Sequence, residues 1–118
     1  MRDYIAINNY SGLGSIGISR HAIDTVAFIA VKNVQDAHIY VGKNRNRQLD
    51  DLFHLTGGVQ TTISNNGKAT IKLDIELKRG ANAVEVSKAV QREVSDLVTL
   101  MCDTIPFDVK VRIAKVIA

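Results

Sequence analysis

The chain has 118 residues, of which 46% are hydrophobic and 23% are charged, and its formal net charge is +3. This length favours one domain with its own core, and this composition excludes intrinsic disorder as the default state. The net charge falls short of the concentrated basic surplus that by itself indicates binding to nucleic acid or anionic lipid. The single cysteine, Cys102, cannot form an internal disulfide, which favours a reducing cytosol.

Targeting and membrane-spanning segments are not recognisable in the sequence. Asp3 stands where a secretory signal carries positive charge, and no apolar stretch of signal-peptide length follows it. The longest apolar run, Val26 to Val31, has six residues, whereas a helix needs about 20 to cross a bilayer. We therefore expect a cytoplasmic protein that would need a partner to stay at a membrane.

A strand and an amphipathic helix are the first predicted elements. Residues 4–18 alternate loosely, and only their last part, around Ile16 and Ile18, is predicted as a strand. Ser19 can cap the helix that follows, because its side-chain oxygen can accept a hydrogen bond from a free amide of the first turn. Between residues 20 and 34, apolar residues recur on one wide arc at 100° per residue, which predicts a helix with one buried face. The residues expected to be buried on this arc are Ala22, Ile23, Val26, Ala27, Ile29, Ala30 and Val34.

Two strands and a long connection come next. A short strand is predicted for residues 37–42, and the pattern then stops between Lys43 and Gly58, a connection long enough to be functional or mobile. Leu49 to Leu55 is a short amphipathic piece within it. Residues 59–64 form the next predicted strand, followed by Asn65-Asn66-Gly67. Asn-Gly is typical of a type I′ turn, in which both central residues take positive φ, so a hairpin is expected here.

The clearest patterns lie in the second half of the chain. Residues 68–78 alternate strictly between apolar and polar, which predicts a strand with one buried face. A capping box of Asn82 and Glu85 begins a second helix. Pro106 ends the helical region, and Phe107 to Ile113 alternate as the last strand. Because strand-helix-strand crossovers within one sheet are right-handed, these two strands should be parallel.

The predicted order is β-α-β-β-β-α-β in a single domain of residues 1–118. Each helix has one apolar face, and the clearest strands have one apolar and one polar face. This combination predicts an α+β fold of two layers, in which two helices cover one face of a mixed sheet and the other face is open to water.

Several features could suggest chemistry, but none meets the conditions for it. Residues 12–17 form a G-x-G-x-x-G run, yet a dinucleotide site needs a helix to open at the second glycine, whereas here a strand is predicted. The three histidines, His21, His38 and His54, share no metal-ligand spacing with one another or with Cys102. We predict no catalytic residue, no cofactor, no metal and no enzymatic activity.

One candidate interface lies on the polar face of the first helix. Phe28 is the one bulky apolar residue that the helical arc does not place in the core, and His21, Asp24 and Lys32 surround it. An aromatic side chain with a polar rim is typical of an interface anchor. The opposing interpretation is that the segment from Leu49 to Leu55 covers Phe28.

A second candidate surface is the open face of the sheet, where basic side chains and one aromatic ring would gather. A surface of this kind can hold single-stranded RNA, because bases stack on aromatic rings and cations meet phosphates. Asp74 and its acidic neighbours interrupt the positive charge, so RNA binding is an alternative only. The predicted anion or RNA contacts are Tyr40, Lys43, Arg45, Arg47, Lys72, Lys110 and Arg112.

Three runs of residues together resemble one known family. They are Gly14-Ser15-Ile16-Gly17-Ile18-Ser19 followed by Val26-Ala27 and Ala30; Lys78-Arg79-Gly80 followed by Val86, Val90-Gln91 and Val94; and Phe107 to Ile113. In this order they resemble the alkaline-shock, or envelope stress response, family of Gram-positive bacteria. Asp36-Ala37 stands where that family usually has Gly-Val, and the basic stretch after Gly42 is not part of its pattern.

The resemblance implies a non-enzymatic cytoplasmic protein of the alkaline or envelope stress response. Members of that family associate with themselves, and some are held at the inner face of the membrane by a separate anchoring protein. Others are tied to fatty-acid or malonyl-CoA metabolism. The expected function is therefore that of a self-associating interaction or scaffold protein. A single-stranded RNA-binding module and an accessory regulator of that metabolism are the alternatives.

Overall fold

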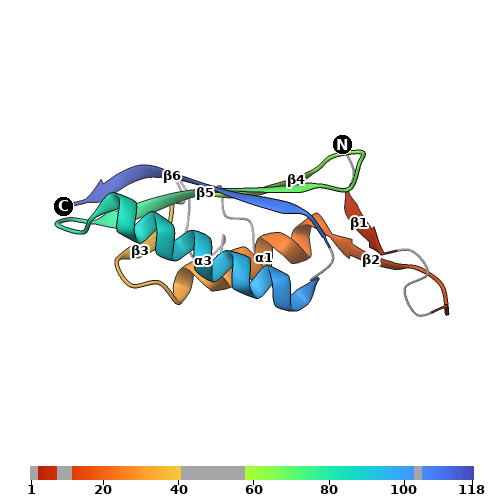
Figure 1. Ribbon diagram of the computed structural model, residues 1–118. Coiled ribbons are helices and arrows are strands. Elements are labelled where there is room, and N and C mark those ends of the chain that lie inside the picture. The colour runs from red at the N-terminus through yellow and green to blue at the C-terminus, as the bar shows by residue number, and fades with distance from the viewer. Residues whose placement is uncertain (1–2, 8–11, 41–57, 103–104) are drawn as a thin grey trace.

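The computed structural model describes residues 3–7, 12–40, 58–102 and 105–118, which contain two helices and six strands. Figure 1 shows both helices on the same side of the main sheet, with a small two-stranded sheet at one end of the molecule. The predicted α+β class is therefore confirmed. The elements are β1 (Tyr4–Ile7), β2 (Ile16–Ser19), α1 (Arg20–Lys32), β3 (Ala37–Ile39), β4 (Val59–Ile63), β5 (Ala69–Lys78), α3 (Ala83–Met101) and β6 (Phe107–Ile117).

The main sheet is built around β5, and β6 pairs with it in parallel along its whole length, as predicted from the crossover rule. The other edge of β5 is shared by two short antiparallel strands, β4 opposite residues 69–73 and β3 opposite residues 75–77. These two strands meet at Asp74, whose N–H donates to the Gly58 carbonyl at 2.7 Å while its own carbonyl accepts from the Tyr40 N–H at 2.9 Å. Within the described residues the sheet is thus three strands wide at any point along β5, and β6 forms one of its edges.

The N-terminal strands differ from the prediction. β2 does not join the main sheet but pairs antiparallel with β1, a strand that the loose alternation of residues 4–18 did not reveal. The two-stranded sheet of β1 and β2 is held at the start of α1. There the Arg20 N–H donates to the Asp3 carbonyl at 2.9 Å, and the side chains of Arg20 and Asp3 form an ion pair at 3.2 Å. Ile5 is buried at 3% exposure, so β1 reaches the edge of the core.

The core lies between the sheet and the two helices, as the apolar periodicities predicted. β5 contributes Ala69, Ile71, Leu73, Ile75 and Leu77, α3 contributes Val86, Val90, Val94 and Val98, and α1 contributes Ile23, Ala27, Ala30 and Val31. All of these residues are buried. Both predicted helix starts are also confirmed: Ser19 Oγ accepts from the Ala22 N–H, and Asn82 Oδ1 accepts from the Glu85 N–H, each at 3.0 Å.

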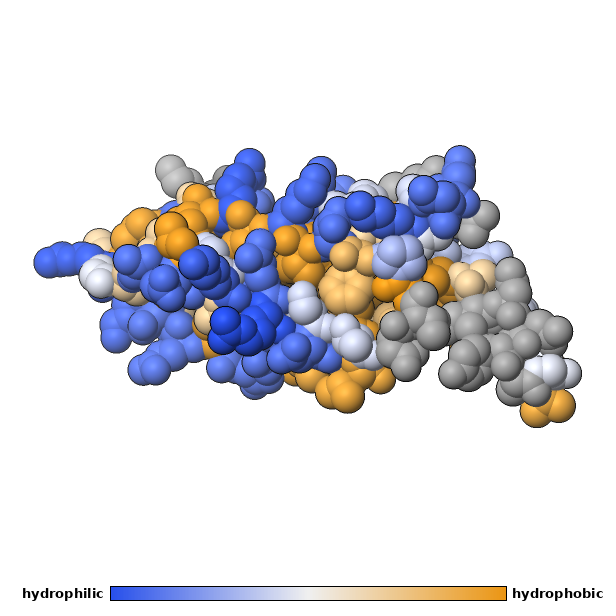
Figure 2. Space-filling model, viewed as in Figure 1, coloured by the Kyte–Doolittle hydropathy of each residue, from blue (hydrophilic) through white to orange (hydrophobic). Residues whose placement is uncertain are grey.

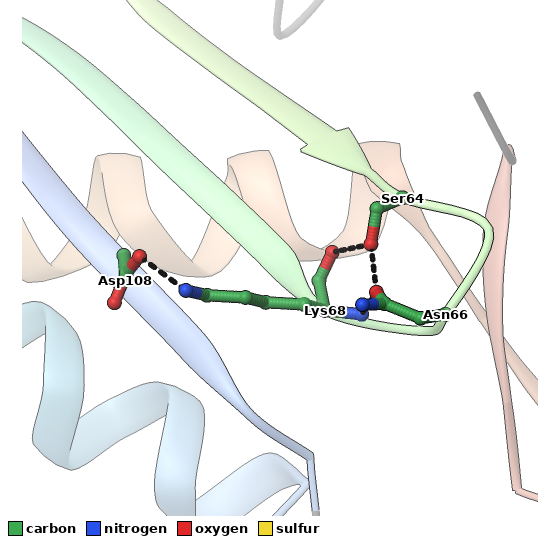
Figure 3. Close-up of polar contacts among 4 residues, drawn as sticks. All are labelled: Ser64, Asn66, Lys68 and Asp108. Carbon is green, nitrogen blue, oxygen red and sulfur yellow. Dashed lines mark hydrogen bonds and ion pairs between the residues drawn. The ribbon is translucent and has the colours of Figure 1, made fainter.

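The β4–β5 hairpin is confirmed, but the predicted type I′ turn is wrong. The Gly67 N–H donates to the Ser64 carbonyl at 3.0 Å, and among the residues of this turn only Gly67 has a positive φ, of 89°. This is the pattern of a three-residue loop that ends in a glycine bulge. Figure 3 shows the side chains of this turn. Asn66 Oδ1 accepts hydrogen bonds from the Lys68 N–H and the Ser64 hydroxyl, so the Asn66 side chain stabilises the turn.

Asp36, which follows α1, is the one described non-glycine residue with a positive φ, of 72°. Its carbonyl accepts from the Lys78 N–H at 2.9 Å, which ties the turn to the end of β5. Glycine adopts this left-handed conformation without a steric penalty, and aspartate is among the residues that tolerate it best. The difference between Asp36 here and the glycine of the resembling family therefore leaves the turn intact.

β6 extends beyond the predicted end at Ile113 to Ile117. An irregularity in its pairing lies between Ile75 and Glu76, so that Lys115 pairs with Glu76 and Val116 with Leu77. One residue, Ala114, is extra on the β6 side. This bulge shifts the alternation by one residue, and for that reason a period-two pattern could not follow the strand past Ile113.

Candidate functional site

The flank of α1 that carries the predicted interface residues packs beside β4. Thr61 is 2% exposed, and its hydroxyl donates to Asp24 Oδ1 at 2.5 Å. A buried hydroxyl without a hydrogen-bond partner would cost about 1–3 kcal/mol, so Asp24 has a structural role. Burial raises the pKa of Asp24 above its ordinary value, although the Thr61 hydrogen bond and the nearby His21 and Arg20 act in the opposite direction.

Phe28 lies on the same flank and is half-buried against the core. The structure therefore brings Phe28 into contact with the core, whereas the helical arc placed it on the polar face. The Lys32 ammonium sits 4.5 Å from the centre of the Phe28 ring, within the range of a cation–π interaction. His21 is exposed at the start of the same helix. Helical spacing brings the four predicted residues together as expected, and their role as an interface stays a proposal.

Replacing Asp24 with Asn should increase stability at pH 7, because the amide is neutral and can still accept from Thr61. A carboxyl whose pKa is raised by folding stabilises the fold only while it is protonated, and this contribution is lost as the pH rises through the folded-state pKa. The advantage of Asp24→Asn should therefore shrink as the pH falls towards 3.8, the ordinary value. Urea unfolding at a series of pH values measures it.

Asp96→Asn, on the exposed face of α3, controls for the loss of one negative charge. An Asp24→Asn protein that is less stable than the parent at pH 7, with a deficit that grows with pH, would show that the ionised carboxylate is the form that the fold prefers.

The open face of the sheet brings three of the predicted anion contacts together. Strand register sets Gln60 beside Lys72 and Lys72 beside Lys110, so the two lysines are direct neighbours on β5 and β6. Neither lysine forms an ion pair with another described residue. Arg112, in contrast, is held by Asp74 through two hydrogen bonds, from Nε at 2.9 Å and from Nη2 at 2.7 Å.

Ion pairs neutralise some of the basic side chains on this face and leave others available to an anion. Asp74 raises the pKa of Arg112 through its hydrogen bonds and charge, so Arg112 is engaged within the sheet. At the other end of the face, Lys68 Nζ lies 2.8 Å from Asp108 Oδ2 (Figure 3), and this hydrogen bond lowers the pKa of Asp108. What remains for an anion is the Lys72–Lys110 pair, beside a shallow hollow of about 290 Å³.

The other predicted anion contacts are not part of this arrangement. Tyr40 directly follows β3 and is half-buried. Lys43, Arg45 and Arg47 lie outside the described residues, as does the amphipathic piece 49–55.

A third surface, which the sequence analysis did not single out, lies between the two helices. An apolar hollow of about 330 Å³ is lined by Val26 and Ile29 of α1 and by Leu97, Leu100 and Met101 of α3. Leu100 is 82% exposed and Ile29 is 48% exposed. The available signal was Leu100 itself, an apolar residue off the buried stripe of α3. We call these five residues the helix groove.

The features that could suggest chemistry in the sequence do not form the sites they would require among the described residues. Cys102 is buried at 3% exposure, with its Sγ 3.4 Å from the Val98 carbonyl, as expected for a packed thiol. In the described part of the chain, no set of three or more His, Cys, Asp and Glu side chains is arranged to hold a metal ion. α1 starts at Arg20 after a strand, so the glycine run 12–17 does not open a helix. No helix among the described residues has the length and apolar character needed to cross a membrane.

Comparison with models of known protein families gives a match over most of the chain. The model of the alkaline shock protein 23 family, described as having a cell envelope-related function, matches residues 8–118. No curated protein and no solved structure matches the chain. Because the family model spans nearly all of the sequence, the resemblance carried by the apolar spacing of both helices and of the last strand is confirmed. The chain therefore belongs to the alkaline shock protein 23 family, whose function is related to the cell envelope.

Proposed function

We propose that this protein serves the cell envelope without catalysis, as a self-associating interaction or scaffold protein. The observation that carries the proposal is the helix groove, where Leu100 and Ile29 expose apolar surface beside Leu97 and Met101. Contiguous exposed apolar surface on a folded domain is typical of an interaction site. The self-association implied by the family resemblance supports the same conclusion.

The geometry of the groove suits a contact between copies of the chain. It lies on the outer side of the helix layer, where two copies can bring the same apolar surface together, as symmetric dimers do. Full burial of one leucine side chain contributes roughly 1.5–3 kcal/mol, and Leu100 is almost fully available for it. Leu100 is therefore the first residue to test.

Leu100→Glu should reduce self-association, because a carboxylate in an apolar contact loses its hydration without gaining a partner. We expect the mass measured by light scattering after size-exclusion chromatography to fall towards the 12.9 kDa of one chain. Thr99→Glu introduces the same charge at an exposed neighbouring position of α3 and should leave the mass unchanged. A parent protein that stays at 12.9 kDa at concentrations of hundreds of micromolar would refute self-association.

The Phe28 flank is the second candidate for this contact. Phe28→Asp is a poor test, since Phe28 packs against the core and its loss would also lower stability. Lys32→Glu removes the cation above the ring and reverses the charge while leaving the core in place. A change in mass with Lys32→Glu and none with Leu100→Glu would place the contact on this flank instead of the helix groove.

The proposed location is the cytoplasmic side of the envelope, with attachment to the membrane through a partner protein. The family's envelope-related function supports this location, together with the behaviour implied by the resemblance. The alternative role as an accessory regulator of fatty-acid or malonyl-CoA metabolism is supported by the resemblance alone.

Binding of single-stranded RNA is the second candidate function, and the Lys72–Lys110 pair favours it. Two like charges side by side on neighbouring strands repel each other, and a bound phosphate would relieve the repulsion. A titration with a labelled single-stranded RNA at two salt concentrations tests it. RNA binding must weaken steeply as the salt concentration rises, whereas an apolar contact between copies should not.

A further inference from the structure

β6 has an edge that no described strand occupies. One edge of β6 pairs with β5, and the described residues include no strand on the other edge. The Pro106 carbonyl accepts from the Ala69 N–H at 3.1 Å, so the backbone groups of residue 106 point towards β5. Because these groups alternate along a strand, those of Phe107, Val109, Val111 and Ile113 point away from β5.

One of these outward-pointing backbone groups already accepts a hydrogen bond from a side chain. Gln91 of α3 donates from Nε2 to the Val109 carbonyl at 3.2 Å. A side-chain amide in this position does for Val109 what the N–H of a neighbouring strand would do. The hydrogen bond therefore shows that the edge can take a donor, and a single exposed glutamine is easily displaced by one.

The same four residues carry apolar side chains that the helix layer covers only in part. Phe107, Val109, Val111 and Ile113 face the helices but are half-buried, whereas the corresponding residues of β5 are fully buried. Val116, farther along β6, is 53% exposed, and Val84 at the start of α3 is 61% exposed. Figure 2 shows a band of apolar surface on this side of the molecule, with polar side chains above and below it.

The side chains that β6 presents on the open face of the sheet are mainly basic, and we call them the basic row. Their charge decides what kind of strand can be added. The side chains of this row are Asp108, Lys110, Arg112 and Lys115. Lys68 holds Asp108 and Asp74 holds Arg112, so Lys110 and Lys115 supply the remaining positive charge. Antiparallel pairing of β6 with β6 of a second copy over most of its length would set basic side chains opposite each other at its centre. Like charges in that position are destabilising, and basic side chains on an edge strand discourage self-pairing.

We infer that the free edge of β6 binds an extended segment of another protein as an added strand, and that this segment alternates apolar and acidic residues. Its apolar side chains extend the band formed by Phe107, Val109, Val111 and Ile113, and its carboxylates lie opposite the basic row. Its backbone takes the place of the Gln91 amide. This mode of recognition draws affinity from the main chain and selectivity from alternate side chains. It is independent of the proposed self-association through the helix groove.

A labelled peptide of sequence Val-Glu-Val-Glu-Val-Glu-Val tests the inference by fluorescence polarisation against the full chain. We expect it to bind, and we expect the peptide with Lys in place of Glu to bind at least about tenfold more weakly, since its charge matches that of β6. Failure of the Glu peptide to bind, or equal binding of the two peptides, would overturn the inference.

Two variants locate the site. Val111→Pro removes an N–H that points to the free edge but none that bonds β5, and it should weaken binding of the Glu peptide about tenfold or more. Circular dichroism and thermal unfolding confirm that the variant is folded. Lys110→Glu should weaken binding of the Glu peptide and strengthen binding of the Lys peptide, a reversal that partial unfolding cannot produce.

Two other results would contradict the proposed site. Unchanged peptide binding by Val111→Pro would place the site elsewhere. Conversion of a dimeric parent into a monomer by Val111→Pro, seen by light scattering, would show that a second copy occupies the edge instead. Leu100→Glu leaves β6 intact and should keep peptide binding, so the two proposals can fail separately.

Discussion

Gly58→Ala is expected to lower the free energy of unfolding by about 3 kcal/mol, the upper end for an added buried atom without room. A Cβ at this position would lie 2.5 Å from the Tyr40 carbonyl oxygen, 2.7 Å from Ile39 Cγ2 and 2.8 Å from the Asp74 carbonyl oxygen. Two of these three atoms are backbone carbonyl oxygens, of Asp74 in β5 and of Tyr40 directly after β3. The hydrogen bond from the Tyr40 N–H to Asp74 joins these residues, so the two oxygens cannot move aside as a flexible side chain would.

The position of Gly58 in the sheet increases this effect. The Asp74 N–H bonds the Gly58 carbonyl at 2.7 Å at the point where β3 and β4 meet on β5. A shift that relieves the clash would weaken this hydrogen bond and the one between Tyr40 and Asp74. The loss therefore includes both steric strain and part of the β-ladder.

Urea unfolding followed by circular dichroism measures the change. Gly17→Ala in β2 is the matched control, because its added Cβ would lie 3.4 Å from the nearest atom, Cδ2 of Tyr4, which is an ordinary contact. The control should change stability by no more than about 0.5 kcal/mol. Equal stability of the two variants would mean that β3 and β4 are not held together at Asp74.

Leu73→Ala should have the second large effect, a loss of about 3 kcal/mol within the 2–5 kcal/mol range for large-to-small core substitutions. Leu73 is 1% exposed on the central strand, between Val59 of β4 and Val111 of β6. Strands on both sides and the helix layer above keep the surroundings from collapsing into the space that is lost. Since domains of this size are stabilised by roughly 5–15 kcal/mol, this is a large part of the total.

The preceding residue provides the control for this substitution. Lys72 lies on the same strand but is exposed on the open face, so Lys72→Ala should change the free energy of unfolding by no more than about 0.5 kcal/mol. Thermal or urea unfolding of both variants distinguishes the two faces of β5. Similar losses from both substitutions would contradict the assignment of one buried and one open face.

Local patterns were sufficient to predict most of the elements. The strict alternation along β5 and the helical spacing of Val86, Val90, Val94 and Val98 report which residues face the core, and the structure buries them as predicted. Ser19 and Asn82 begin their helices because capping depends on residues within one turn. The membership of the family was likewise readable from residues along the chain.

The candidate sites were less predictable, because each depends on what other segments cover. Helical spacing puts Phe28 on a polar arc, but the packing of α1 beside β4 brings it against the core, while Ile29, expected to be buried, is exposed beside α3. The hydrogen bond between Asp24 and Thr61 joins residues from two elements, and no local signal reports it.

The sequence alone determined the order of the main elements, their apolar faces and the α+β class, since these follow from periodicity and capping over a few neighbouring residues. Tertiary structure alone decided that β2 leaves the main sheet to pair with β1, that β3 and β4 share one edge of β5, and that β6 keeps its other edge free of any described strand. Strand pairing joins backbone groups that are nearly the same in every residue. The choice of partner therefore depends on how the whole chain packs, and so do the exposed surfaces on which the proposed functions rest.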